Sequence, residues 1–220
     1  MLNDAFRRLP LVLLLLARVG LAAPASKVER IGALTSASVS GALRNSLEKS
    51  GYRVFQDDGS VLCEIWLRNG MPTGQKKDNA AAIYTDFAES TLAGVISFPK
   101  ATTDYRGQAV KPGTYTLRYE LHPNDGNHLG VSPYRDFLLL VFPSDDPDPN
   151  AQFKFEDLVN LSRKVSGTTH PAPLSLVAPE AREYPSVFRD DQEHTIFAAK
   201  LKTERGEVPI ALVIKGKAAQ

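Results

Sequence analysis

The segment spanning residues 122–136 is the part of the chain richest in side chains that do chemistry. It lies between two strongly apolar stretches, and a polar loop held by rigid strands is where β proteins commonly place binding sites. We therefore expect a ligand site in this segment. The side chains expected to contact the ligand are His128, Asp125, Arg135, Asp136 and Tyr134.

The histidines of this segment also raise the hypothesis of a transition-metal site. His122, His128 and His170 would supply imidazole nitrogens, which suit zinc or copper. A carboxylate from Asp125 or Asp136 would add an oxygen ligand. The five residues between the first two histidines match no compact ligand motif, so the ligands would have to meet through folding alone.

The alternative interpretation is that these polar groups only shape the loop. His122 precedes a proline at the end of a strand, and Asp125 is followed by glycine, as in a turn. Arg135 and Asp136 would then form an ion pair that closes the loop. Both interpretations remain open from the sequence.

Other catalytic motifs are missing or incomplete in the sequence. There is no Gly-x-Ser-x-Gly elbow and no glycine-rich phosphate loop. Residues 46–49 match Ser-x-x-Lys, but the partner motifs of penicillin-recognising enzymes are not found. The aspartates of residues 144–150 do not follow the calcium-loop pattern, and we expect a solvated, proline-stiffened loop there.

These observations favour a non-enzymatic binding or envelope-scaffold module. The partner would be a small molecule, a glycan or an envelope protein. The alternative function is that of a metal-dependent enzyme, a hydrolase or an oxidoreductase, that uses His122, His128 and His170.

Residues 1–25 have the order of features that is typical of a secretory signal peptide. An arginine pair at residues 7–8 precedes an apolar run at residues 9–17, and small residues follow. The apolar run is roughly half the ~20 residues that a membrane-spanning helix needs. We expect cleavage after Ala25, with residues 20–22 as an alternative exit, and a periplasmic or secreted protein with no membrane span after cleavage.

The composition excludes some classes of partner. The chain has 26 basic and 25 acidic side chains, and removal of residues 1–25 would leave 23 basic and 24 acidic. A nucleic-acid binder would show a basic stripe or a strongly basic balance, so we expect no nucleic-acid partner. The one cysteine, Cys63, lies in an apolar stretch and is expected to be a buried, unreactive thiol.

The elements that must position the polar segment are mostly strands. We expect strands at 52–55, 61–67, 92–98, 114–121, 136–142, 174–177, 194–203 and 208–215, and two short helices at 39–49 and 155–164. The strict alternation in 114–121 predicts one buried and one wet face. The expected fold is mainly β, a single-domain β-sandwich or open barrel with two short helices that spans residues 26–220.

Two stretches of the chain resemble known proteins. Residues 110–117 (Val-Lys-Pro-Gly-Thr-Tyr-Thr-Leu) resemble the proline-glycine-initiated strand of many exported bacterial β-sandwich modules. Residues 125–137 (Asp-Gly-Asn-His-Leu-Gly-Val-Ser-Pro-Tyr-Arg-Asp-Phe) resemble a group of uncharacterised exported bacterial β-sandwich proteins, with a looser likeness at 166–171. The resemblance implies export and a β fold, and it assigns no activity.

Overall fold

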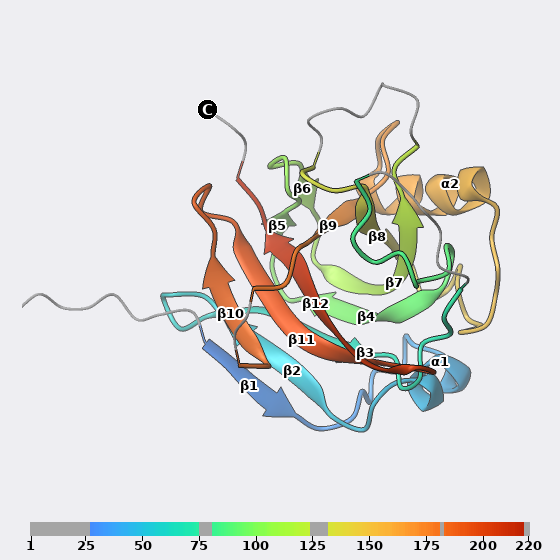
Figure 1. The fold of residues 1–220 in the computed structure, drawn as a ribbon, viewed down its shortest axis with the longest axis horizontal. Coiled ribbons are helices and arrows are strands. Elements are labelled where there is room, and N and C mark those ends of the chain that lie inside the picture. The colour runs from blue at the N-terminus through green and yellow to red at the C-terminus, as the bar shows by residue number, and fades with distance from the viewer. Residues whose placement is uncertain (1–26, 75–80, 124–131, 181–182, 218–220) are drawn as a thin grey trace, which may run out of the picture.

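A computed structural model describes residues 27–74, 81–123, 132–180 and 183–217 of the chain. Figure 1 shows their arrangement as a strongly curved sheet with two helices on its outside. The elements are β1 (Lys27–Ile31), α1 (Gly41–Ser46), β2 (Gly51–Phe55), β3 (Val61–Leu67), β4 (Leu92–Phe98), β5 (Thr102–Thr103), β6 (Ala109–Val110), β7 (Gly113–Leu121), β8 (Asp136–Val141), α2 (Phe155–Ser166), β9 (Pro173–Val177), β10 (Ser186–Arg189), β11 (Thr195–Thr203) and β12 (Gly206–Lys215).

Ten of the strands form one antiparallel sheet in the order β1-β2-β3-β4-β7-β8-β9-β12-β11-β10. The edge strands β1 and β10 approach each other, so the sheet is nearly closed into a barrel (Figure 1). The short strands β5 and β6 form a separate hairpin. The predicted mainly β fold with two short helices is confirmed, and its form is that of an open barrel.

The strands predicted at 52–55 and 61–67 are present and form a hairpin around an Asp-Gly turn. β2 pairs with β3 in antiparallel register, with Tyr52 opposite Ile65 and Val54 opposite Cys63. Gly59 in the turn has a φ of 78°, a backbone conformation that glycine adopts without steric cost. Turn chemistry and β-branched residues together were therefore enough to place this pair.

The inside of the barrel is filled by apolar side chains. Along β7 the inward set is Tyr115, Leu117, Tyr119 and Leu121, all of them buried. Cys63 belongs to the same core and is fully buried, as expected, and burial raises the pKa of its thiol. A packed interior leaves the binding of ligands to the outside of the barrel.

The outer face of the sheet is covered in part by the two helices. α1 packs its Leu43 with Trp66 of β3 and Val95 of β4. α2 packs its Leu158 and Val159 against the outward side chains of β8, which are Phe137, Leu139 and Val141.

The predicted wet face of β7 is wrong. Thr116, Arg118 and Glu120 point outward, but each is buried to 1% exposure or less. Arg118 forms an ion pair with Asp146, so the loop at 144–150 lies over the strand instead of standing in solvent. Alternation located the strand correctly, but it carried no information about the segment that covers its second face.

Four strands were not predicted. β1 and β10 are edge strands in which every residue except Phe188 is exposed or half-buried, and β5 and β6 have two residues each. In the described part of the chain, no helix is long and apolar enough to cross a membrane.

Candidate functional site

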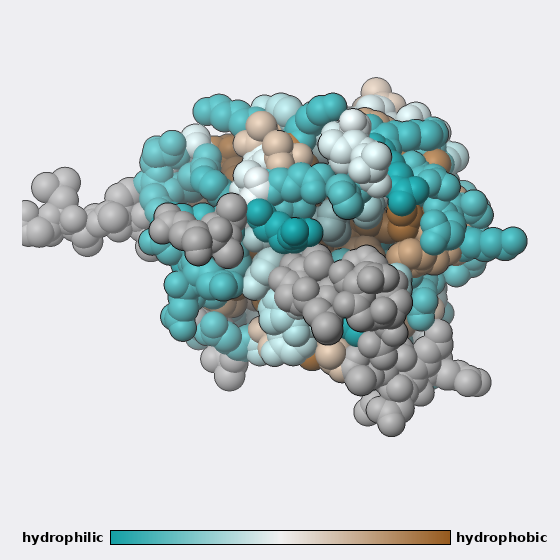
Figure 2. Space-filling model, turned by 90° about the horizontal axis from the view of Figure 1, so that it is seen from above, coloured by the Kyte–Doolittle hydropathy of each residue, from teal (hydrophilic) through white to brown (hydrophobic). Residues whose placement is uncertain are grey.

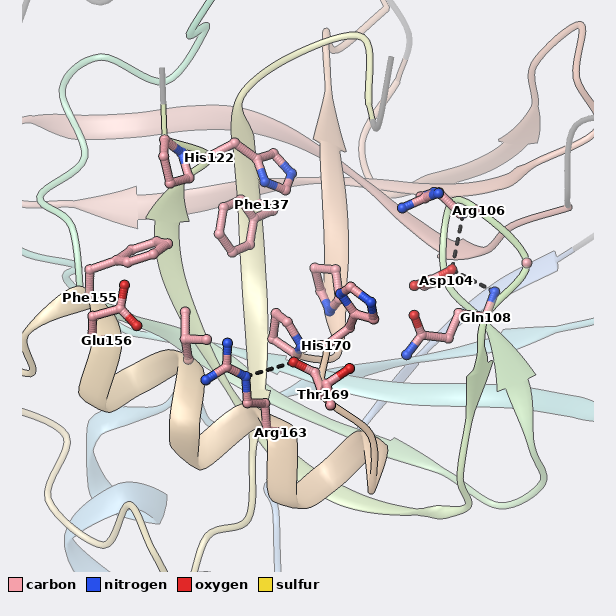
Figure 3. A pocket seen from close by; sticks show the side chains of 15 residues that line it. Asp104, Arg106, Gln108, His122, Phe137, Phe155, Glu156, Arg163, Thr169 and His170 are labelled. Atoms are coloured by element: carbon pink, nitrogen blue, oxygen red, sulfur yellow. Dashed lines mark hydrogen bonds between the residues drawn. The ribbon is translucent and has the colours of Figure 1, made fainter. Parts of the chain in front are cut away.

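A pocket of about 700 Å³ lies on the outside of the barrel, between α2 and the turn that joins β5 to β6 (Figure 3). We call it the α2 pocket. Ligand sites in proteins commonly have volumes of ~300–1,000 Å³. Its lining residues are Asp104, Arg106, Gly107, Gln108, His122, Pro123, Phe137, Phe155, Glu156, Val159, Arg163, Thr169, His170, Pro171 and Pro173.

One wall of the α2 pocket is a face of α2 itself. Phe155, Val159 and Arg163 are four residues apart, and this spacing places side chains on one face of a helix. Gly167 follows the last residue of the helix and has a φ of 69°, the left-handed conformation typical of this position. The wall therefore changes from aromatic to cationic along the helix.

The connection from α2 to β9 is tied back to the helix by hydrogen bonds. The Arg163 Nε donates to the Thr169 carbonyl at 2.8 Å, and the Ser166 hydroxyl donates to the His170 carbonyl at 2.5 Å. The Ala172 amide donates to the Ser162 hydroxyl at 3.0 Å. These bonds hold Thr169 and His170 along the edge of the pocket.

The opposite wall is the turn at residues 104–108. The Asp104 Oδ1 accepts hydrogen bonds from the backbone amides of Arg106 at 3.0 Å and of Gln108 at 2.8 Å. Burial raises the pKa of the Asp104 carboxyl, against smaller opposing effects of these two hydrogen bonds and of the Arg106 charge. Asp104 therefore shapes this wall, while the side chains of Arg106 and Gln108 line it (Figure 3).

The same turn is held from behind by the end of β12. The Gly216 amide donates to the Thr103 carbonyl at 2.9 Å, and the Thr103 hydroxyl donates to the Gly216 carbonyl at 2.5 Å. A Cβ at Gly216 would lie 1.8 Å from the Asp104 carbonyl oxygen, so only glycine fits this close approach.

The third side of the pocket is built where β7 ends and β8 begins. The His122 amide donates to the Arg135 carbonyl at 2.8 Å, and the Arg135 Nε donates to the His122 carbonyl at 2.7 Å. The His122 ring packs on Phe137, with ring centroids 4.3 Å apart. Extension of the strand ladder by one residue pair thus sets the position of His122.

The structure brings two of the predicted site residues to one pocket. His122 and His170 are 48 positions apart in the sequence, yet both line the α2 pocket (Figure 3). Asp125 and His128 lie outside the described residues. Tyr134 packs against an apolar cluster on the outside of β11 and β12 and does not line the pocket.

Asp136 and Arg135 have partners other than each other. The Asp136 carboxylate is buried and accepts hydrogen bonds from the Ile83 amide at 2.8 Å, the Tyr84 amide at 3.0 Å and the Tyr119 hydroxyl at 2.7 Å. Arg135 uses its Nε on the His122 carbonyl. Asp136 therefore fixes the segment before β4 to the end of the barrel and does not line the pocket.

The metal hypothesis rests on the two histidines. Within the ranges that the structure describes, no group of three or more His, Cys, Asp or Glu side chains is arranged to hold a metal ion. The predicted trio of His122, His128 and His170 includes one residue outside those ranges. The hypothesis of a transition-metal site thus stays a prediction.

Several pocket residues were not predicted from the sequence. Arg163 belongs to a basic pair that looks like ordinary surface, and Phe155 looks like one more apolar helix position. Arg106 and Gln108 lie in a turn between two strands of two residues each. No local pattern marks any of them, because their proximity depends on the order of strands in the sheet.

A second, smaller pocket of about 320 Å³ lies where β1 approaches the other end of the sheet. Its lining residues are Arg30, Glu48, Tyr52, Tyr184, Pro185, Lys200, Lys202 and Glu207. We call it the seam pocket. Its charges are largely paired, since Lys200 lies 3.4 Å from Glu207 and Lys202 lies 3.7 Å from Glu48. Figure 2 shows the molecule from above, where the coloured residues are mostly hydrophilic and apolar residues appear in separate patches.

The comparisons with known proteins identify no relative. The chain matches no protein-family model, no curated protein and no solved structure.

Proposed function

We propose that the protein is an exported, non-enzymatic binding module that holds a small organic molecule in the α2 pocket. The observation that carries this proposal is the combination in one pocket of a ligand-sized volume, apolar side chains and polar ones. Phe155 offers an apolar surface, with the nearly buried Phe137 and Val159 beside it, and Arg106, Arg163 and Gln108 offer hydrogen-bond donors.

Binding is favoured over catalysis by the roles of the polar groups. The Asp104 Oδ1 accepts hydrogen bonds from two backbone amides, so this carboxylate has a structural role in the turn. Arg163 is held by acceptors of its own helix and the following loop. A small molecule is the preferred partner among those expected, because a glycan chain or an envelope protein needs an extended surface and this pocket is local.

Export is proposed from the amino-terminal sequence. The arginine pair, the short apolar run and the small residues before Ala25 support a cleaved signal peptide, and β1 begins two residues further on, at Lys27. The mass of the protein recovered from the medium or periplasm of an exporting host tests this. A mass that lacks residues 1–25 supports export, and retention of the full chain in the cytoplasm contradicts it.

Ligand-observed NMR with a library of small fragments tests the binding role. In Gln108→Trp, a large side chain would fill the pocket, and we expect the fragment signals of the wild-type protein to be lost. The matched control is Gln152→Trp, which places the same residue at an exposed position that does not line the pocket. Fragments that bind both variants equally well would refute the proposed site.

A second candidate function, a metal-dependent hydrolase or oxidoreductase, is favoured by one observation. Two of its three proposed ligands, His122 and His170, line the same pocket. Metal analysis of protein purified from an exporting host decides between the two functions. Near-stoichiometric zinc or copper that is lost in His170→Ala would support the enzyme, and metal-free protein that added zinc or copper does not stabilise would exclude it.

A further inference from the structure

We propose that the ligand of the α2 pocket is an organic carboxylate. Its carboxylate would pair with Arg163, next to Thr169 and His170, and its apolar body would lie toward Phe155. This inference rests on the proposed function and adds the class and the orientation of the ligand.

Arg163 is held in place by neutral acceptors. Its Nε donates to the Thr169 carbonyl at 2.8 Å, and its Nη1 donates to the Asn160 Oδ1 at 2.7 Å. Among the described residues, no carboxylate lies within ion-pair distance of its guanidinium. The guanidinium thus rests on neutral acceptors and has no carboxylate partner among these residues, an arrangement that suits a planar anion.

The two acids of the pocket are accounted for by the structure around them. Asp104 shapes its turn through the amides of Arg106 and Gln108, and the Arg106 charge acts on it directly. Glu156 lies in the first turn of α2, where a negative charge is favoured by the helix dipole. The pocket thus holds two acids and two arginines, and Arg163 is the arginine with no carboxylate partner among the described residues.

The position of the apolar side chains sets the orientation. Phe155 and Val159 precede Arg163 on the same face of α2, and Phe137 faces them from β8 (Figure 3). A ligand with its carboxylate on Arg163 would therefore extend its body along the helix toward the aromatic end of the pocket.

Arg163 also has a structural role that the test must separate from binding. A cation in the last turn of a helix is favoured by the dipole, and the bond to Thr169 fixes the following loop. Loss of Arg163 could weaken any ligand by loosening this loop. The decisive quantity is therefore the preference for an anion over a neutral molecule of the same shape, which a purely structural role would not change.

The experiment compares three probes with one naphthalene body: 1-naphthaleneacetate, 2-(1-naphthyl)ethanol and 2-(1-naphthyl)ethylamine. Dissociation constants are measured by fluorescence and by NMR on the mature protein at low and high salt. For the wild type we expect the carboxylate to bind about 10-fold or more tighter than the alcohol, the lower range for a charge-assisted hydrogen bond. Added salt should weaken the binding of the carboxylate and leave the binding of the alcohol unchanged.

Arg163→Gln should bring the ratio of carboxylate to alcohol affinity close to one, while the alcohol stays within about threefold of its wild-type affinity. Arg163→Lys keeps the charge and should retain part of the preference. Arg205→Gln is the matched control, since Arg205 loses the same charge in an exposed turn between β11 and β12. Thermal unfolding of each variant confirms that it is folded.

Each outcome decides the question. Equal affinity of the carboxylate and the alcohol, tighter binding of the amine, or a preference that survives Arg163→Gln would overturn the anion inference and leave the binding role intact. If none of the three probes binds while other fragments bind the pocket, the inference is refuted and the binding role stands. If no fragment of the NMR screen depends on the pocket either, the proposed function is refuted as well.

Discussion

Replacement of Arg118 by methionine should remove much of the stability of the protein. Arg118 and Asp146 are both fully buried, and all five guanidinium N–H groups find acceptors. Two of these bonds go to Asp146, and three go to the carbonyls of Ser90, Asp148 and Ala151. Arg118→Met would leave a buried carboxylate with the Thr116 hydroxyl as its remaining donor among the described residues.

The expected loss in the free energy of unfolding is about 3–5 kcal/mol, the range found when one partner of a buried ion pair is removed. This is a large part of the ~5–15 kcal/mol that stabilises a typical domain. The unpaired, buried charge of Asp146 should account for most of the lost free energy of unfolding.

Urea-induced unfolding, followed by the fluorescence of Trp66, measures this change. The double variant Arg118→Met with Asp146→Asn removes both charges and should recover part of the loss. Lys200→Met is the control, because Lys200 and Glu207 form a half-exposed pair and the change should be less than about 1 kcal/mol. A loss below about 1 kcal/mol in Arg118→Met would refute the argument that this buried ion pair stabilises the loop over β7.

Three further predictions follow from the turn at the pocket and from the core. Gly216→Ala should lower stability by about 1–3 kcal/mol and weaken fragment binding, because its Cβ meets the Asp104 backbone. Gly32→Ala, with open space around its Cβ, is the control for thermal unfolding, and equal melting temperatures of the two variants would contradict the close approach. Asp104→Asn should be at least as stable as the wild type at pH 7. Because the pKa of Asp104 is raised in the folded protein, its contribution to the free energy of unfolding is fully present below the unfolded pKa and is lost as pH rises through the folded pKa. The gain in stability from asparagine should therefore shrink as the pH is lowered. A gain in melting temperature that grows at low pH would contradict this sign. Cys63 is fully buried and its thiol pKa is raised, so iodoacetamide should modify it only after unfolding; rapid labelling of native protein, seen by mass spectrometry, would refute its burial.

The strands were largely predictable from the sequence because local patterns encode them. β4 and the β2–β3 hairpin are found where β-branched runs and an Asp-Gly turn place them. The burial of Arg118 was not predictable in the same way. It depends on Asp146, 28 positions later, folding back over β7. Period-two alternation does not indicate which segment covers a face of the strand.

The site was only partly predictable for the same reason. His122 and His170 line one pocket because the sheet places β8 between β7 and β9. That the two act together stays a prediction. Arg163 and Arg106 reach that pocket from a helix and a turn with no distinguishing pattern. Only the three-dimensional order of strands brings these segments together, and no single stretch of sequence carries that order.

Mapping of the bound fragments on the protein tests the central claim most directly. Amide ¹H–¹⁵N NMR spectra of the protein would be recorded during titration with 1-naphthaleneacetate. We predict shifts that cluster at the turn of residues 104–108, at Arg163 and at Thr169. Shifts confined to the seam pocket around Tyr52 and Lys200, or no saturable shifts with this probe and the fragments, would contradict a ligand site between α2 and the barrel.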